Sequence, residues 1–218
     1  MIASMAGVAL GNQFSGSNSN KPPIADTNVT PEATGSALTW PDGPALTIDE
    51  GKPYVATMRT NKGDIKVELL PDAPKTANSF AFLAGNGFFD GDIFFYVDKQ
   101  LGAVAGDPTC RVSSDQTCSG LGGPGYTLPL ENTSASHDQW MVVAPFLSEG
   151  EGQIHGSQFR VLYGPDARLN GKETVFGKVV QGQDILQALS DNDCVGVEAK
   201  TCSGDGGVVI QKVTVQPA

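Results

Sequence analysis

Two short segments of alternating apolar and polar residues, joined by a glycine-containing turn, most strongly constrain how this chain can fold. Residues 54–59 alternate, residues 64–70 alternate again, and Asn61-Lys62-Gly63 lies between them. Alternation with a period of two places successive side chains on opposite faces of a strand, and a short turn joins two such strands as a hairpin. The segment therefore predicts an antiparallel β-hairpin with one buried face.

The pattern continues as short strands that are separated mostly by turns. Pro71-Asp72-Ala73-Pro74 ends the second strand, and helical spacing of apolar residues follows over 75–86. A second helix is predicted at 184–190. Five further strands are predicted, at 93–97, 140–146, 158–163, 174–180 and 208–215. Seven or eight strands with only two helices favour a mainly β antiparallel barrel or sandwich over a doubly wound α/β fold.

The chain before residue 51 has a different composition. Residues 1–10 are small, apolar and uncharged, which fits either the trailing end of a signal or anchor helix or an unstructured terminus. Of the 35 residues in 11–45, 21 are Gly, Ser, Thr, Asn or Pro, so too little apolar surface is available to offset the entropy of ordering. We therefore predict an apolar end and flexible linker over 1–50, and one folded domain over 51–218.

The net charge restricts the partners of the chain. Fourteen Lys and Arg residues against 24 Asp and Glu residues give a formal charge of −10 at pH 7, and there is no basic run. Nucleic-acid binders and proteins that dock on anionic lipid through charge show the opposite pattern. The sequence also contains no stretch of 18 apolar residues, so it has no complete membrane span.

Four cysteines fall into two pairs with the same spacing. Cys110 and Cys118 are eight residues apart, as are Cys194 and Cys202, and both pairs lie in Ser-, Asp- and Gly-rich stretches. This spacing is not typical of a zinc site, and we expect no metal. We predict the disulfides Cys110–Cys118 and Cys194–Cys202 in an oxidising compartment. Cross-paired connectivities, or four free thiols, remain the alternatives.

Five segments along the domain resemble the cyclophilins. They read TNKGDIKVELLPDAPKTANSFAFLAGNGFFDGDIF (60–94), GDPT (106–109), GGPGY (122–126), GSQF (156–159) and LNGKETVFGKVVQG (169–182). The resemblance implies an eight-stranded antiparallel barrel capped by two helices, and peptidyl-prolyl cis-trans isomerase activity without a cofactor. The tethered front end is similar to extracytoplasmic bacterial members, so a secreted or membrane-tethered location is expected. The expected partners are proline-containing peptides or unfolded proteins. The chain is expected to be monomeric.

The residues at the family's catalytic strand differ from the family pattern. In cyclophilins an arginine follows Phe-His on the third strand, and here the tripeptide is Phe94-Phe95-Tyr96. Tyr96 therefore occupies the arginine position, where its hydroxyl can donate only one neutral hydrogen bond. The phenylalanine, methionine and glutamine that follow in the family are matched by Leu101, Gly102 and Val104.

The facing strands supply the other candidate site residues that the resemblance implies. Gln158 matches a substrate-orienting glutamine, and Phe159 matches a core position. Arg160 replaces the aromatic floor of the proline pocket and is a possible surrogate cation. The remaining substrate-binding candidates are Phe94, Ala144, Arg168, Leu169 and Glu173.

Three functions compete on this evidence. The first is an isomerase with a remodelled site of weak activity, in which Tyr96, Gln158 and Arg160 act on the peptide. The second is a peptide-binding or scaffold module without catalysis, in which Arg160 and Arg168 are exposed or pair with acids such as Glu173. The third is an unrelated function on the same barrel. A hydrolase is disfavoured because Ser157 near His155 has no acid placed to orient the histidine, and His137 beside Asp138 is expected in an exposed loop.

Overall fold

The computed structural model describes residues 38–114, 118–148, 152–191 and 207–218. Its helices are α1 (Pro74–Gly85) and α2 (Gln183–Asp191), with short 3-10 turns η1 (Pro108–Cys110) and η2 (Ala167–Leu169). Its strands are β1 (Tyr54–Thr60), β2 (Gly63–Leu69), β3 (Tyr96–Asp98), β4 (Gly102–Ala105), β5 (Thr127–Pro129), β6 (Met141–Ala144), β7 (Gln153–His155), β8 (Phe159–Val161), β9 (Thr174–Gln181) and β10 (Ile210–Pro217). Within these residues no helix is long and apolar enough to span a membrane.

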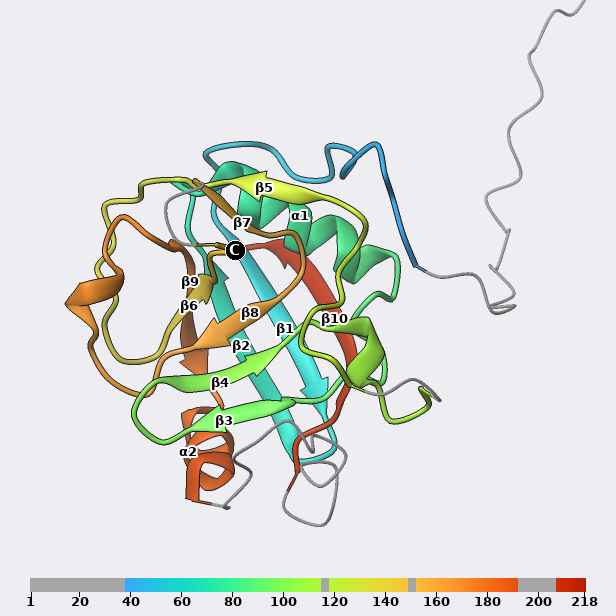
Figure 1. The fold of residues 1–218 in the computed structure, drawn as a ribbon, viewed down its shortest axis with the longest axis vertical. Coiled ribbons are helices and arrows are strands. Elements are labelled where there is room, and N and C mark those ends of the chain that lie inside the picture. Colours follow the sequence, from blue (N-terminus) through green and yellow to red (C-terminus); the bar gives the residue numbers. More distant parts are fainter. Residues whose placement is uncertain (1–37, 115–117, 149–151, 192–206) are drawn as a thin grey trace, which may run out of the picture. The chain divides into compact units, whose positions relative to one another are not determined.

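Eight strands form one curled antiparallel sheet in the order β10-β1-β2-β9-β6-β8-β4-β3, and β5 pairs separately with β7 (Figure 1). The two edges of the large sheet meet just before β3 and β10. Ile93 forms an antiparallel bridge with Val209, and the backbone of Ile210 donates to the carbonyl of Asp92 at 2.8 Å. This contact closes the sheet into the mainly β barrel that the sequence predicts, and closure protects edge strands that would otherwise expose unpaired backbone groups.

Aromatic side chains fill the interior of the barrel beside α1. Phe80 of α1 stacks on Phe89 with ring centroids 4.9 Å apart, and contacts Phe159 edge-on at 5.6 Å. Helix α1 begins with Pro74, whose missing N–H costs nothing at the first turn. The carboxylate of Glu131 accepts the free backbone N–H groups of Lys75 and Thr76 at 3.0 and 2.8 Å. A distant acid therefore caps the helix that covers the core.

Residues 38–50 belong to the folded domain, so the boundary predicted at residue 51 is too late in the sequence. Trp40 contacts Phe82 and Phe88 with ring centroids 5.4 and 6.1 Å away. Ile48 is buried in the same core, and its backbone N–H donates to the side-chain oxygen of Asn78. These apolar contacts were obscured by the Gly, Ser and Pro residues around them. The rest of the predicted linker lies outside the described residues.

The predicted hairpin, helices and principal strands correspond to β1, β2, α1, α2, β6, β8, β9 and β10. The predicted strand 93–97 is shorter, since only residues 96–98 form β3. Strands β4, β5 and β7, which are three or four residues long, were not predicted. In the structure Cys110 and Cys118 are joined as a disulfide, with Cα atoms 4.3 Å apart. The predicted partners Cys194 and Cys202 lie outside the described residues.

Candidate functional site

One row of side chains crosses four neighbouring strands on the outer face of the barrel. Tyr96 of β3 lies opposite Val104 of β4. Val104 lies opposite Arg160 of β8, which in turn lies opposite Val143 of β6. Adjacent strands are about 4.8 Å apart, so about 10 Å separates the backbones of Tyr96 and Arg160. The fold therefore brings two of the three predicted catalytic residues to one face, on either side of Val104.

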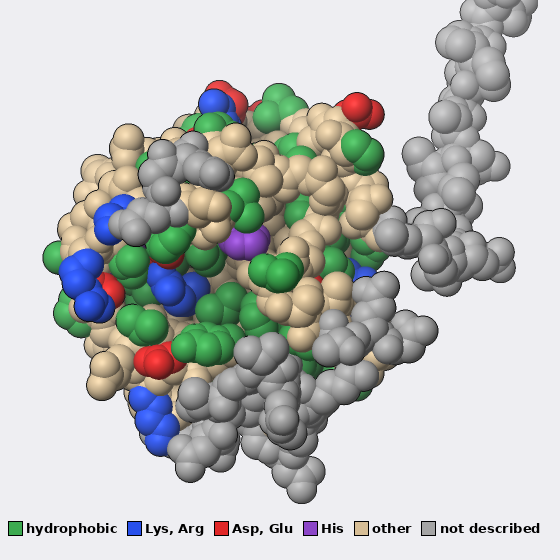
Figure 2. Space-filling model, in the orientation of Figure 1, with side chains coloured by type: hydrophobic (Ala, Val, Ile, Leu, Met, Phe, Trp, Pro, Cys, Tyr) green, Lys and Arg blue, Asp and Glu red, His purple; other side chains and the backbone are tan. Residues whose placement is uncertain are grey.

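The alternation of strand residues explains why this row faces outward. Val97, Ala103, Phe159 and Val161 are fully buried in the interior core, while Arg160 between the last two is only partly buried. Figure 2 shows the face on which β3, β4 and β8 lie in Figure 1, and hydrophobic side chains there surround a Lys or Arg side chain near the centre. The outer face thus combines an apolar surface with a central cation.

Arg160 is held by a buried acid. Its Nη2 donates to Oε2 of Glu173, and the two side chains are 14% and 1% exposed. The Nε of Arg160 is buried and has no hydrogen-bond partner among the described residues. Burial raises the pKa of the Glu173 carboxyl, and the Arg160 cation opposes that rise. Glu173, predicted at the rim of a peptide site, instead lies beneath Arg160 as its counter-ion.

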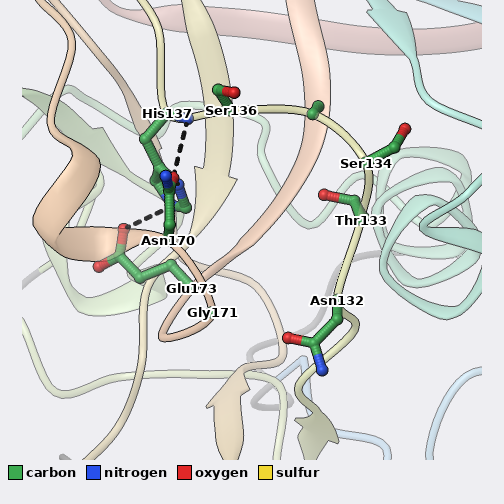
Figure 3. A pocket seen from close by; sticks show the side chains of 9 residues that line it. Asn132, Thr133, Ser134, Ser136, His137, Asn170, Gly171 and Glu173 are labelled. Carbon is green, nitrogen blue, oxygen red and sulfur yellow. Dashed lines mark hydrogen bonds and ion pairs between the residues drawn. The ribbon is translucent and has the colours of Figure 1, made fainter.

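His137 lies on the other side of Glu173 and is buried, so the predicted exposed loop position is wrong. Its Nε2 is 3.9 Å from Oε2 of Glu173, and its Nδ1 is 2.8 Å from the side-chain oxygen of Asn170 (Figure 3). Asn170 follows η2 and is 33 residues away in sequence. No local pattern in the sequence signals a contact between two loops this far apart, which is why His137 and Asn170 were missed.

A polar pocket of about 200 Å³ lies against His137, Asn170 and Glu173. Its opposite wall is the segment Asn132–Ser136, and in Figure 3 the Thr133 hydroxyl points across the pocket toward the side of Asn170 and Glu173. The pocket therefore reaches the buried His137 and Glu173 side chains from the loop side, while Arg160 reaches Glu173 from the strand side.

Gln158 is buried beside the row and holds the glycine-rich loop. Its Nε2 donates to the carbonyls of Gly120 and Gly122 at 3.0 and 2.9 Å. Asp107 fixes the same loop from the other side, because its carboxylate accepts the backbone N–H of Gly122 at 3.0 Å. In this arrangement the amide nitrogen of Gln158 is occupied by the loop carbonyls. A bound peptide would therefore have to contact the side-chain oxygen of Gln158 or the loop itself.

Tyr96 packs against the disulfide that precedes this loop. Cys110 and Cys118 form a small buried cluster with Ile93 and Phe95, and Tyr96 and Val104 pack against it. The disulfide thus supports the outer face under Tyr96. The loop beyond it carries Leu121, which is 85% exposed and lines a groove of about 300 Å³ with Tyr126 and Leu147.

Several predicted substrate-binding residues do not face the outer surface. Phe94 and Phe159 are buried in the interior core, where their rings meet edge-on with centroids 6.0 Å apart. The side chain of Ala144 also belongs to that core. Inward and outward positions alternate along a strand, so these residues support the site from inside and cannot contact a peptide on the outer face.

The two predicted residues on η2 lie at the surface. Arg168 is exposed and forms a two-point ion pair with Asp166, with both distances 2.8 Å. This pairing lowers the pKa of Asp166 to about 2. Leu169 is partly buried beside Arg168, and Leu101 is partly buried in the turn between β3 and β4, where its backbone N–H donates to Asp98.

Gly102 occupies a position where no side chain fits. Its φ is +132°, and a Cβ atom there would lie 2.1 Å from the carbonyl oxygen of Val161. The close approach of β4 to β8 therefore requires glycine. The apolar side chain expected at this position in the family cannot be accommodated without moving β8.

The fold is an antiparallel β-barrel whose outer face carries apolar residues, a cation and a flanking glycine-rich loop. The model of the family described as "Cyclophilin type peptidyl-prolyl cis-trans isomerase/CLD" matches residues 55–215. The chain therefore belongs to the cyclophilin-type peptidyl-prolyl cis-trans isomerase family.

Curated relatives carry the same name. Peptidyl-prolyl cis-trans isomerase B of Bacillus subtilis is 35% identical over 130 residues, which cover 59% of this chain and 85% of the relative. Peptidyl-prolyl cis-trans isomerase A of Mycobacterium tuberculosis is 31% identical over 182 residues, covering 73% and 91%. The human peptidylprolyl isomerase domain and WD repeat-containing protein 1 is 29% identical over 83% of this chain, but this chain spans only 26% of that protein.

A solved structure supports the fold. The crystal structure of a Cryptosporidium parvum cyclophilin type peptidyl-prolyl cis-trans isomerase aligns with a TM-score of 0.64 and 24% identity, covering 76% of this chain and 99% of that chain. The same protein in the presence of the dipeptide Ala-Pro aligns with a TM-score of 0.63. Among the described residues of the present chain, no group of three His, Cys, Asp or Glu side chains is placed to hold a metal ion.

Proposed function

We propose that the outer face of β3, β4 and β8 binds extended, proline-containing peptides and accelerates the cis-trans exchange of their X-Pro bonds at a low rate. The observation that carries this proposal is the row Tyr96–Val104–Arg160, which places two hydrogen-bond donors beside an apolar strand residue. Family membership supports peptide as the ligand, as does the structure of a relative in the presence of the dipeptide Ala-Pro.

The chemistry requires a donor that acts only when the amide twists. Amide resonance sets a barrier of roughly 18–20 kcal/mol to rotation about the peptide bond. A donor directed at the proline nitrogen stabilises the twisted state, in which the nitrogen lone pair is no longer delocalised. Arg160 can supply a charged donor when its guanidinium turns from Glu173 toward the outer face of β3, β4 and β8, which is the proposed peptide groove. Tyr96 can supply only a neutral one.

The decisive experiment measures exchange of an Ala-Pro peptide by NMR with wild-type chain and with Arg160→Ala. The wild type is expected to accelerate exchange, and Arg160→Ala is expected to lose most of the acceleration, by about tenfold or more for a charged donor. Arg59→Ala is the matched control, because Arg59 is exposed on β1, outside the row. Wild-type acceleration that persists unchanged in Arg160→Ala would show that the guanidinium has no role.

A second candidate function is a peptide-binding module without catalysis. Two contacts favour it, because Glu173 engages Arg160 and the glycine-rich loop engages the amide of Gln158. Such a module would bind proline peptides in a titration and leave their exchange rate unchanged. The two candidates therefore separate when affinity and exchange are measured on the same peptide.

We also propose that the chain acts outside the cytoplasm, secreted or tethered through its first residues. The Cys110–Cys118 disulfide supports this, since such bonds persist in oxidising compartments. In the chain-entropy model, closing this short loop stabilises the fold by about 2–3 kcal/mol. Reducing agent should therefore lower the melting temperature of protein purified from its native source. A full count of free thiols in that protein would contradict the proposed location.

A further inference from the structure

Three ionisable side chains form a line from the polar pocket to the proposed peptide groove. Oε2 of Glu173 accepts a hydrogen bond from Arg160 and lies 3.9 Å from Nε2 of His137. The side chains of His137 and Glu173 are 2% and 1% exposed, so water screens their interaction little. Because both groups approach one oxygen atom, the charge on His137 affects how strongly Glu173 holds Arg160.

Asn170 determines which ring nitrogen of His137 carries the first proton. The side-chain oxygen of Asn170 accepts the backbone N–H of His137 at 3.3 Å and lies 2.8 Å from the ring Nδ1. A backbone N–H can only donate, so this atom of Asn170 is the oxygen and Nδ1 must be the donor. The ring therefore directs Nε2 at Glu173, as a lone pair when neutral and as a second N–H when charged.

The two charge states of His137 have opposite effects on Arg160. With Nε2 protonated, His137 and Arg160 share the single carboxylate of Glu173, and each is held less strongly. With Nε2 deprotonated, its lone pair faces the carboxylate, and Arg160 is the only cation that offsets the buried charge of Glu173. When one of two cations beside a buried anion loses its charge, the anion depends more strongly on the remaining cation.

We propose that His137 is a positioning residue of the peptide groove: protonation of its ring weakens the hold of Glu173 on Arg160 and frees the guanidinium to face a bound proline peptide. This inference rests on the proposed function, which gives Arg160 its role. It adds a residue from a distant loop to the site, and it connects the polar pocket with the groove through Glu173.

Two other charged groups face the same network. Asp166, at the start of η2, interacts with both Glu173 and Arg160, and Arg168 pairs with Asp166. The hydrogen bond from Arg168 lowers the pKa of Asp166 to about 2. Asp166 and Arg168 therefore keep constant charges between pH 5 and pH 8, so they add no pH dependence to the network.

The test compares the pH dependence of peptide exchange in two His137 variants. His137→Asn keeps a donor for Asn170 but has no group that reaches Glu173. His137→Gln places a permanently uncharged donor toward Glu173. The wild type should exchange an Ala-Pro peptide about two- to fivefold faster near pH 5 than near pH 8, a change of less than about 1 kcal/mol in the hold of Glu173 on Arg160. Both variants should lose this pH dependence, and His137→Asn should stay at the slow level.

Ser136→Ala is the matched control for this comparison. Ser136 precedes His137 and lines the same pocket, but it makes no contact with Glu173 or Arg160 in the described structure. We expect this variant to keep the wild-type pH profile, because the network behind the groove is unchanged. Melting temperatures of all variants show whether a lost profile reflects a lost fold.

A second readout does not depend on activity. The chain has two histidines, so the ring ¹⁵N resonances of His137 and His155 can be assigned with one variant. Glu173→Gln removes the negative partner and should lower the fraction of His137 rings that carry two protons at a given pH. Arg160→Ala removes the competing cation and should raise that fraction. The resonances of His155 should respond to neither change.

The two readouts separate failure of the inference from failure of the proposed function. If the wild type exchanges no peptide at any pH while His137 responds to both substitutions, isomerase activity is refuted and the coupling of His137 to Arg160 stands. The positioning role is overturned if His137→Asn keeps the wild-type pH profile. It is equally overturned if the His137 ring resonances do not change in Arg160→Ala and Glu173→Gln.

Discussion

At the scale of single residues, Arg160 shows how one polar side chain changes an apolar surface. It stands between the core residues Phe159 and Val161, so strand alternation directs it outward into the row that also contains Tyr96, Val104 and the buried Val143. A cation that is 14% exposed loses much of its hydration, and the carboxylate of Glu173 offsets that loss. The substitution of an aromatic residue by arginine is therefore accompanied by an acid just before β9.

Gln158 gives a residue-scale prediction about the glycine-rich loop. Gln158→Glu replaces the NH₂ group that donates to the carbonyls of Gly120 and Gly122 with an acceptor. Two partly buried carbonyls then face a carboxylate, so unfolding free energy should fall by about 1–3 kcal/mol in urea denaturation. Gln153→Glu is the control: the Gln153 oxygen accepts from Thr127, and glutamate keeps that acceptor. Equal stabilities of the two variants would contradict the assigned role.

At the scale of elements, the barrel closes at Asp92, between α1 and β3. Its two carboxylate oxygens accept the backbone N–H groups of Ile93 and Gly106 at 2.9 and 2.7 Å. Its backbone carbonyl accepts the N–H of Ile210 at the start of β10. One buried residue therefore joins β10, the segment leading into β3 and the end of β4. The barrel depends on this junction because no regular strand pairing joins β3 to β10 among the described residues.

Asp92→Asn should weaken that junction. An asparagine must direct its NH₂ group at one of the two backbone N–H donors, so unfolding free energy at neutral pH should fall by about 1–3 kcal/mol. Asp90→Asn is the control, since Asp90 is an exposed neighbour and should change stability by less than about 0.5 kcal/mol. Chemical denaturation with each variant measures both values. A stable Asp92→Asn variant would show that the junction is held by backbone contacts alone.

The same residue predicts how stability depends on pH. Burial raises the pKa of Asp92 from 3.8 to about 8, although the two backbone hydrogen bonds act to lower the pKa. Between these values the folded state binds more protons than the unfolded state, so the contribution of Asp92 to unfolding free energy falls as pH rises from about 4 to about 8. Asp92→Asn should remove this component from the pH profile. An identical slope in the variant would place the titrating group elsewhere.

At the scale of the whole molecule, residues 38–50 complete the domain by covering α1 and the core below it. Trp40 contacts Phe82 and Phe88, and its backbone N–H donates to Pro124 at 2.7 Å. Asn78 of α1 accepts the backbone N–H of Thr47 at 2.7 Å. The segment therefore joins the helix to the glycine-rich loop beside the proposed groove.

Trp40→Ala tests the contribution of this segment to global stability. Burial of a large apolar side chain stabilises by about 1.5–3 kcal/mol, so the midpoint of urea denaturation should fall accordingly. Leu46→Ala is the control from the same segment, because Leu46 is 74% exposed and should have little effect. If Trp40→Ala unfolds at the wild-type midpoint, the contacts of Trp40 contribute nothing to global stability.

The sequence by itself determined most of the strand and helix pattern and the family, and it placed Tyr96 and Arg160 on two separate strands. These are properties of residues close together in the chain, such as the alternation in β1 and β2 or the proline that begins α1. Only the tertiary structure decided that Glu173 lies beneath Arg160 and that His137 is buried against Asn170. Those contacts join loops and strands that are distant in sequence, and their energies depend on burial and charge, which no local pattern encodes.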